Sequence, residues 1–129
     1  MALKAYVVED NAAIRDSLVE ALSELAGIAS AGTAGTEKAA VAWLRDPANA
    51  WDLAIVDLAL EPGGGGFGVL QSLRSRRSTQ QVLVLTGRAD PEVRRRCEAL
   101  GADGVFDKGM ETEALLDHCA KLARAAGGH

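Results

Sequence analysis

Short apolar runs alternate with amphipathic stretches along the chain, and this alternation predicts the secondary structure. Residues 53–56 and 82–85 are apolar at every position, which is typical of strands buried on both faces of a parallel sheet. The stretches between such runs repeat apolar residues three or four apart, as helices that cover a sheet do. We therefore expect five strands, each followed by a helix, over residues 3–8, 28–34, 53–56, 81–86 and 104–107.

Residues that favour helix ends support this division. Asn11 or Asp10 can cap the first helix, Thr36 the second and Asp90 the fourth, while Gly27 can end the first. The third helix is expected around residues 67–73, with the basic residues of 74–77 at its C-terminal end. Five strand–helix repeats imply parallel strands, right-handed crossovers and helices on both faces, so the predicted fold is a doubly wound α/β sheet.

Composition and charge narrow the class of protein. The chain has 129 residues, 48% of them hydrophobic and 25% charged, which predicts a single folded domain over residues 1–125 and a disordered tail over 126–129. The net charge of −4 argues against a general nucleic-acid-binding surface, and Arg94–Arg96 are expected to form a solvated helix face. No run is long enough to span a membrane, and Cys97 and Cys119 are expected to be reduced thiols, so we expect a cytoplasmic protein.

Charged and hydroxyl residues stand where four of the strands end. Glu9 and Asp10 follow the first strand and Asp57 ends the third. Thr86 ends the fourth strand and Lys108 follows the fifth. Because the carboxyl ends of parallel strands meet at one edge of a sheet, where such folds bind their ligands, we expect these side chains to lie together.

Three carboxylates in one place repel each other and favour a hard divalent cation. Mg²⁺ prefers oxygen ligands and takes one or two carboxylates together with phosphate oxygens and water. Asp10 and Asp57 are the expected direct ligands, with Glu9 acting through water. Asp57 is also a competent nucleophile toward a phosphoryl group, whose oxygens Lys108 and Thr86 could bind.

These five positions, in this order and strand context, resemble the receiver domain of two-component response regulators, and the resemblance covers residues 3 to about 124. It implies a flavodoxin-like (βα)5 fold with strand order 2-1-3-4-5. It also implies Mg²⁺-dependent transfer of a phosphoryl group to Asp57 from a histidine kinase or a histidine phosphotransfer protein. Such a domain is a signalling module rather than an enzyme, because it catalyses only its own phosphotransfer and dephosphorylation.

The resemblance also implies an output. Phosphorylation would move Thr86 and an aromatic switch, and would remodel the surface formed by residues 90–125, where a downstream protein target binds. We expect a monomer or a weak homodimer with no direct contact to nucleic acid. Since about five residues follow the last helix, we expect no attached DNA-binding module. The sequence leaves open whether the chain is a stand-alone regulator, a phosphate shuttle or an excised receiver.

Two positions near the last strand depart from the family pattern, and two others are positions that often tune the lifetime of the acyl phosphate in the family. The usual switch aromatic, three residues before the lysine, is replaced by Val105, with Phe106 on the other strand face; Gly109 replaces the usual proline. Two residues after the phosphoacceptor stands Ala59, whose backbone carbonyl is a candidate third Mg²⁺ ligand. Arg88, two residues after Thr86, could shield the phosphoryl group or bind it. The loop containing glycines 63–66 is expected to be flexible.

Three other functions deserve comparison. An aspartate-nucleophile, Mg²⁺-dependent phosphatase of the haloacid-dehalogenase type would need a second aspartate where Ala59 stands. A flavodoxin-type flavin module is disfavoured because only 4% of the residues are aromatic. A degenerate receiver acting as a phosphorylation-independent interaction module remains an alternative.

Overall fold

The computed structural model describes residues 3–60 and 65–126, and it confirms the predicted alternation of strands and helices. Residues 127–129 of the predicted tail, and residues 61–64 with the first glycines of the predicted flexible loop, lie outside the described part. The elements are β1 (Lys4–Val8), α1 (Ala12–Ala26), β2 (Ala29–Ala34), α2 (Glu37–Leu44), β3 (Leu53–Asp57), α3 (Gly66–Ser72), β4 (Gln81–Thr86), α4 (Pro91–Ala99), β5 (Gly104–Asp107) and α5 (Thr112–Ala126).

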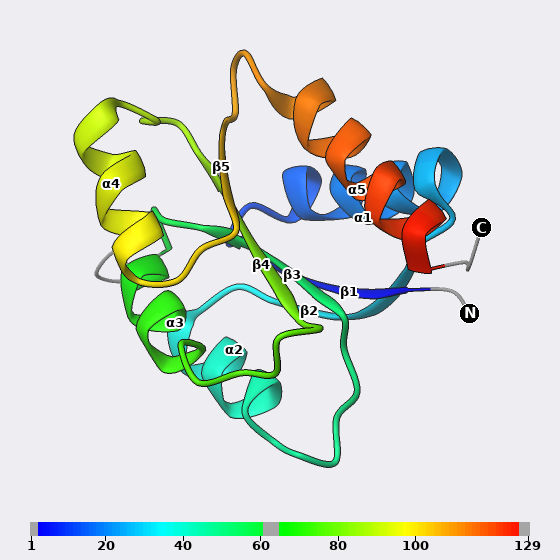
Figure 1. The fold of residues 1–129 in the computed structure, drawn as a ribbon, viewed down its shortest axis with the longest axis horizontal. Helices are drawn as coiled ribbons and strands as arrows, with labels where there is room; N and C mark the ends of the chain where they lie inside the picture. Colours follow the sequence, from blue (N-terminus) through cyan, green and yellow to red (C-terminus); the bar gives the residue numbers. More distant parts are fainter. Residues whose placement is uncertain (1–2, 61–64, 127–129) are drawn as a thin grey trace.

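The five strands form one parallel sheet in the order β2-β1-β3-β4-β5, as predicted. Figure 1 shows α1 and α5 together on one side of the sheet and α2, α3 and α4 on the other. All strand carboxyl ends therefore point to the same edge, and β3 lies at the centre of the sheet. Within the described ranges, no helix is both long and apolar enough to cross a membrane.

The core consists of two apolar clusters, one on each face of the sheet. Along β3, Ala54 and Val56 belong to the cluster under α2, α3 and α4, whereas Leu53 and Ile55 belong to the cluster under α1 and α5. Side chains of a strand alternate between its faces, so a strand covered by helices on both sides is apolar at every position. This geometry explains the continuous apolar run, and it makes Asp57, also buried, an exception to it.

Helix ends follow the predicted residues closely. The side chains of Asn11, Thr36 and Asp90 accept hydrogen bonds from backbone N–H groups at 3.0, 3.2 and 2.9 Å, each satisfying a donor of the first helical turn. Gly27 ends α1 in a left-handed conformation with φ 65°.

The third helix spans Gly66–Ser72, close to the predicted 67–73, and the arginines of residues 74–77 follow its C-terminal end. Arg76 donates to the carbonyl of Leu73, the C-cap residue, at 3.0 Å. The same guanidinium also donates to the carbonyl of Gly101.

Candidate functional site: an acidic cluster at the carboxyl edge of the sheet

Two buried carboxylates mark the carboxyl edge of the central strands. Asp57 is the last residue of β3, and Glu9 follows β1 directly, where its N–H donates to the Ala34 carbonyl at 2.9 Å. Their exposed fractions are 3% and 2%. Carboxylates are seldom this buried unless they are paired or bind a metal, so the site needs a cation.

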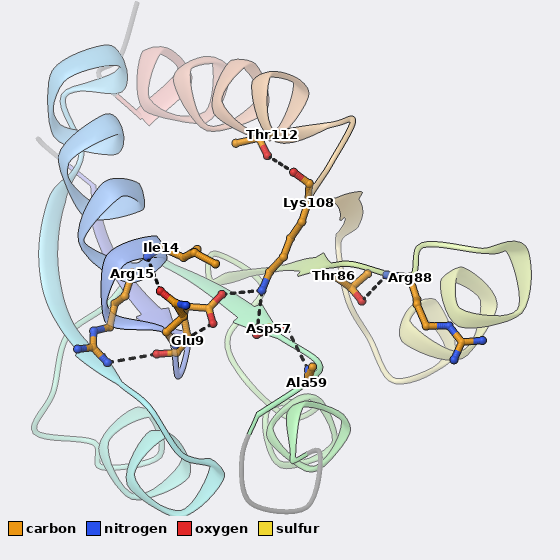
Figure 2. A network of polar contacts seen from close by, with 10 residues as sticks. Glu9, Ile14, Arg15, Asp57, Ala59, Thr86, Arg88, Lys108 and Thr112 are labelled. Carbon is orange, nitrogen blue, oxygen red and sulfur yellow. Dashed lines mark hydrogen bonds and ion pairs between the residues drawn. The ribbon is translucent and has the colours of Figure 1, made fainter.

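Lys108 supplies one positive charge between the two carboxylates. Its Nζ lies 2.8 Å from Glu9 Oε1 and 3.1 Å from Asp57 Oδ2, and Figure 2 shows the side chain reaching toward both from the segment between β5 and α5. The lysine backbone is fixed at both ends: its N–H donates to the Thr86 carbonyl at 2.8 Å, and its carbonyl accepts from the Thr112 hydroxyl at 2.9 Å. Lys108 therefore contacts Asp57, as the sequence predicted.

The charges in the cluster do not balance. Burial raises the pKa of Glu9, the adjacent Lys108 ammonium and the hydrogen bond from the Asn11 N–H oppose this shift, and Asp57 adds to it. For Lys108, burial would lower the pKa, but the two carboxylates outweigh burial and raise it. Lys108 therefore stays charged at neutral pH, and a single ammonium serves two buried carboxylates.

A third carboxylate completes a group that could hold a metal ion. Glu9, Asp10 and Asp57 each offer an oxygen, and these oxygens all lie within 4.8 Å of one another. The contact of Glu9 Oε1 with Lys108 is an ion pair without hydrogen-bond geometry, so this buried oxygen has no hydrogen-bond donor among the described residues. An incompletely satisfied, all-oxygen donor set with excess negative charge fits Mg²⁺.

Backbone groups of neighbouring residues lie close to Asp57. The Ala59 N–H donates to Asp57 Oδ1 at 3.0 Å and so fixes one carboxylate oxygen. On the other side, Gly66 begins α3 against the backbone of Asp57 and Leu58, where a Cβ atom would overlap the Asp57 carbonyl oxygen. A glycine at this position lets the helix approach the strand end closely.

Thr86 also ends its strand at this edge, and its side chain is 4% exposed. Its hydroxyl accepts from the Arg88 N–H at 3.1 Å, as Figure 2 shows, and this contact stabilises the turn after β4. The hydroxyl keeps its own proton available for another acceptor. A hollow of about 500 Å³ adjoins this strand end, and Ala59, Thr86 and Arg88 are among its lining residues.

The two residues at the expected switch position lie as the sequence predicted. Val105 packs into the cluster under α2, α3 and α4, whereas Phe106 packs on the opposite face, with its ring centroid 5.9 Å from that of His118. Phe106 therefore lies on the α5 side of the sheet, away from the face that Val105 occupies.

The predicted solvated face holds for Arg95 and Arg96, which are exposed, but sequence reasoning missed the contacts of the half-buried Arg94 and the ring contact of Arg96. Arg94 donates to the carbonyls of Ala89 and Val105 and pairs with Glu111. Arg96 lies 3.8 Å from the centre of the Phe67 ring. Helical spacing gave no signal of these contacts, because the partners lie in loops and on other elements.

Comparison with known proteins shows which protein family this fold and this site belong to. A family model, the response regulator receiver domain, matches residues 5–120, and the chain belongs to this family. It is therefore a receiver domain of two-component signal transduction. The phosphatase alternative gains no support, since Ala59 occupies the position of the second aspartate.

Particular relatives agree with this assignment. Over 126 residues, the chain is 32% identical to the two-component response regulator PhoP of Pseudomonas aeruginosa, covering 98% of this chain and 54% of PhoP. It is 35% identical over 121 residues to the response regulator RppA of Synechocystis, covering 86% of this chain and 51% of RppA. The chain thus spans about half the length of these relatives.

Solved structures support the fold. The signal receiver domain of a DNA-binding response regulator from Colwellia psychrerythraea superposes with a TM-score of 0.80 at 22% identity, covering 95% of this chain and 98% of that one. The response regulator DrrB of Thermotoga maritima gives a TM-score of 0.78 at 24% identity, covering 98% of this chain and 54% of that one.

Proposed function

We propose that Asp57 accepts a phosphoryl group from the phosphohistidine of a histidine kinase or a histidine phosphotransfer protein. The observation that carries this proposal is the pair of buried carboxylates, Asp57 and Glu9, which share Lys108 as their cation. Phosphoryl transfer to a receiver needs a nucleophilic carboxylate at the edge of the sheet. It also needs neighbouring groups that bind a cation and the phosphoryl oxygens.

In the proposed transfer, an oxygen of Asp57 forms a bond to phosphorus while the bond from phosphorus to the imidazole nitrogen breaks. The electron pair of the broken bond stays on the imidazole, and the product is an acyl phosphate on Asp57. The Ala59 N–H holds the carboxylate in place, Lys108 binds one phosphoryl oxygen, and the free proton of Thr86 serves another. Hydrolysis later restores the carboxylate.

Asp10 and Asp57 would hold Mg²⁺ directly, together with the Ala59 carbonyl, and Glu9 would act through water. The clustering of the three carboxylates supports this assignment. When bound, Mg²⁺ supplies neutralisation of the charge on the phosphoryl oxygens.

The phosphodonor must reach Asp57 from the open side of the sheet edge. There, an apolar groove of about 410 Å³ lies between α1 and α5, with Ile14, Lys108 and Leu116 among its lining residues. Ile14 is also one of the exposed large hydrophobic residues. We infer that the helix carrying the donor histidine packs along this groove, because it leads to the reactive carboxylate.

The downstream partner is proposed to be a protein that binds the surface of residues 90–125. We propose no direct contact of this chain with nucleic acid, because its net charge is −4 and Arg94 is engaged within the domain. The relative DevR/DosR of Mycobacterium tuberculosis is a DNA-binding transcriptional activator, and this chain covers 62% of its length. We propose a cytoplasmic location, since a kinase partner there would supply the phosphoryl group, and a monomer or weak homodimer in solution.

Acetyl phosphate with Mg²⁺ tests the acceptor assignment directly. We expect intact-protein mass spectrometry to detect one added phosphoryl group on the wild-type domain, and none after Asp57→Asn or after chelation of Mg²⁺. Asp16→Asn, an exposed aspartate on the nearby helix α1, is the matched control and should be labelled normally. Unchanged labelling of the Asp57→Asn variant would overturn the proposal, and absence of labelling in wild type would favour the phosphorylation-independent interaction module.

A further inference from the structure

Helix α4 contributes few residues to the apolar core, namely Cys97 and the partly buried Val93. Among its nine residues, Cys97 is the fully buried one. Arg96 reaches the Phe67 ring of α3, and Arg94 reaches toward β5 and α5. Because this apolar burial is limited, the contacts of the two guanidinium groups also help to hold α4 in position.

Arg94 connects three segments through one planar group. Its Nε donates to the Ala89 carbonyl at 2.9 Å, in the loop between β4 and α4. Its Nη1 donates to the Val105 carbonyl of β5 at 2.8 Å, and its Nη2 pairs with Glu111 Oε1 just before α5. The same Glu111 oxygen accepts the Asp107 N–H at 3.0 Å, so Arg94 also fixes the loop from β5 to α5.

This connection begins close to the acidic cluster. The Thr86 carbonyl accepts the Lys108 N–H, and its hydroxyl accepts the Arg88 N–H. Ala89 follows Arg88 directly, so a displacement of Thr86 must shift the Ala89 carbonyl or break the turn that joins them. Figure 2 shows the Thr86–Arg88 contact leading away from Asp57 toward α4.

We propose that Arg94 is the element that couples Thr86 to β5 and the start of α5, at a place where Val105 offers no aromatic ring. A movement of Thr86 toward a phosphoryl group on Asp57 shifts the Ala89 carbonyl, and the guanidinium then changes its contacts with Val105 and Glu111. The inference rests on the proposed function, because it needs Thr86 to respond to the phosphoryl group.

The Arg94–Glu111 ion pair is exposed enough to rearrange when the domain changes conformation. The side chains of Arg94 and Glu111 are 37% and 36% exposed, so their ion pair is partly hydrated and can rearrange at low cost. A rearrangement would also alter the charges that α4 and the loop before α5 present to a partner. Arg94 is therefore a positioning residue for the output surface and takes no part in phosphoryl transfer.

Beryllofluoride with Mg²⁺ serves as a stable phosphoryl analogue for the test, read by ¹H–¹⁵N NMR spectra of the whole chain. The amides of Ala59 and Asn11 report on the site, whereas those of Val105 and Glu111 report on the output side. In wild type, we expect both sets to shift, together with the Arg94 Nε–H signal. In Arg94→Met, the site amides should shift as in wild type, and the shifts of Val105 and Glu111 should fall by more than half.

Arg95→Met is the matched control, because Arg95 is the exposed neighbour on the same helix; it should respond like wild type. Arg94→Lys keeps the charge but cannot reach all three partners at once, so it should lose the distal shifts in a folded protein. Full distal shifts in both Arg94 variants would overturn the proposal. A wild-type spectrum without site shifts would instead refute the proposed function, and the coupling with it.

Discussion

The two ends of the sheet both hold charged residues, but only one end leaves its charges unbalanced. At the amino end, Arg76 donates to the carbonyls of Leu73, Gln80 and Gly101 and pairs with Asp103 at 2.7 Å. Asp103 Oδ2 also accepts the Val82 N–H at 2.8 Å. At the carboxyl end, Lys108 serves both Glu9 and Asp57, and Glu9 Oε1 has no hydrogen-bond donor among the described residues.

This difference separates a structural cluster from a functional one. The amino-end cluster pairs one cation with one acid, and Arg76 also donates to three backbone carbonyls, so its charge and most of its donors are already engaged. A hollow of about 240 Å³ lies beside it, lined in part by Trp51 and Arg76, yet its arginine is already engaged. The carboxyl-end cluster has an excess of acceptors, and a natural site often keeps such an unfavourable arrangement for its function.

The largest effect should come from breaking the satisfied cluster. Arg76→Met removes a cation whose side chain is only 11% exposed, and it takes one donor from each of Asp103 and three backbone carbonyls. We expect the free energy of unfolding, measured by urea titration, to fall by about 3 kcal/mol. Arg77→Met, at an exposed arginine of the same turn, should change it by less than about 0.5 kcal/mol. Equal losses in the two variants would show that Arg76 has no special structural role.

Neutralising one acid at each end should change stability in opposite directions. In metal-free buffer, Asp57→Asn removes repulsion with Glu9 while Lys108 stays paired to Glu9, so we expect a gain of about 1 kcal/mol. Asp103→Asn weakens the contacts of Arg76 and of the Val82 N–H, and we expect a loss of about 1 kcal/mol. Asp16→Asn should be neutral. Changes of the same sign at both ends would remove the distinction drawn between them.

Much of the fold was predictable because its signals are local in the sequence. The run 53–56 marks a strand covered on both faces, and Asn11, Thr36 and Asp90 cap the helices that they precede. The site was predictable for a topological reason: parallel strands place Glu9, Asp57 and Lys108 at one edge regardless of how the helices pack.

The arginine contacts were not predictable in this way. Arg94 reaches partners 11 and 17 residues away, at Val105 and Glu111, and Arg76 pairs with an acid 27 residues away. Helical periodicity separates a buried face from a solvated one, but a long arginine side chain can start on the solvated face and reach a neighbouring loop. Such contacts depend on loop conformation, which a single sequence with no structure does not fix.

The smallest of the effects concerns the pH dependence of stability at the carboxyl end. Because burial raises the pKa of Glu9, the folded state keeps this proton to higher pH than the unfolded chain does. The contribution of Glu9 to stability is therefore complete below the ordinary pKa of 4.5 and is lost as the pH rises through its raised value. The free energy of unfolding of wild type, relative to Glu9→Gln, should fall in metal-free buffer as the pH rises above 4.5 and through the raised pKa of Glu9. Saturating Mg²⁺ should abolish this fall, because a bound cation favours the ionised carboxylate. If the free energy of unfolding of wild type relative to Glu9→Gln instead rose with pH in the absence of metal, the excess of negative charge inferred for this end of the sheet would be contradicted.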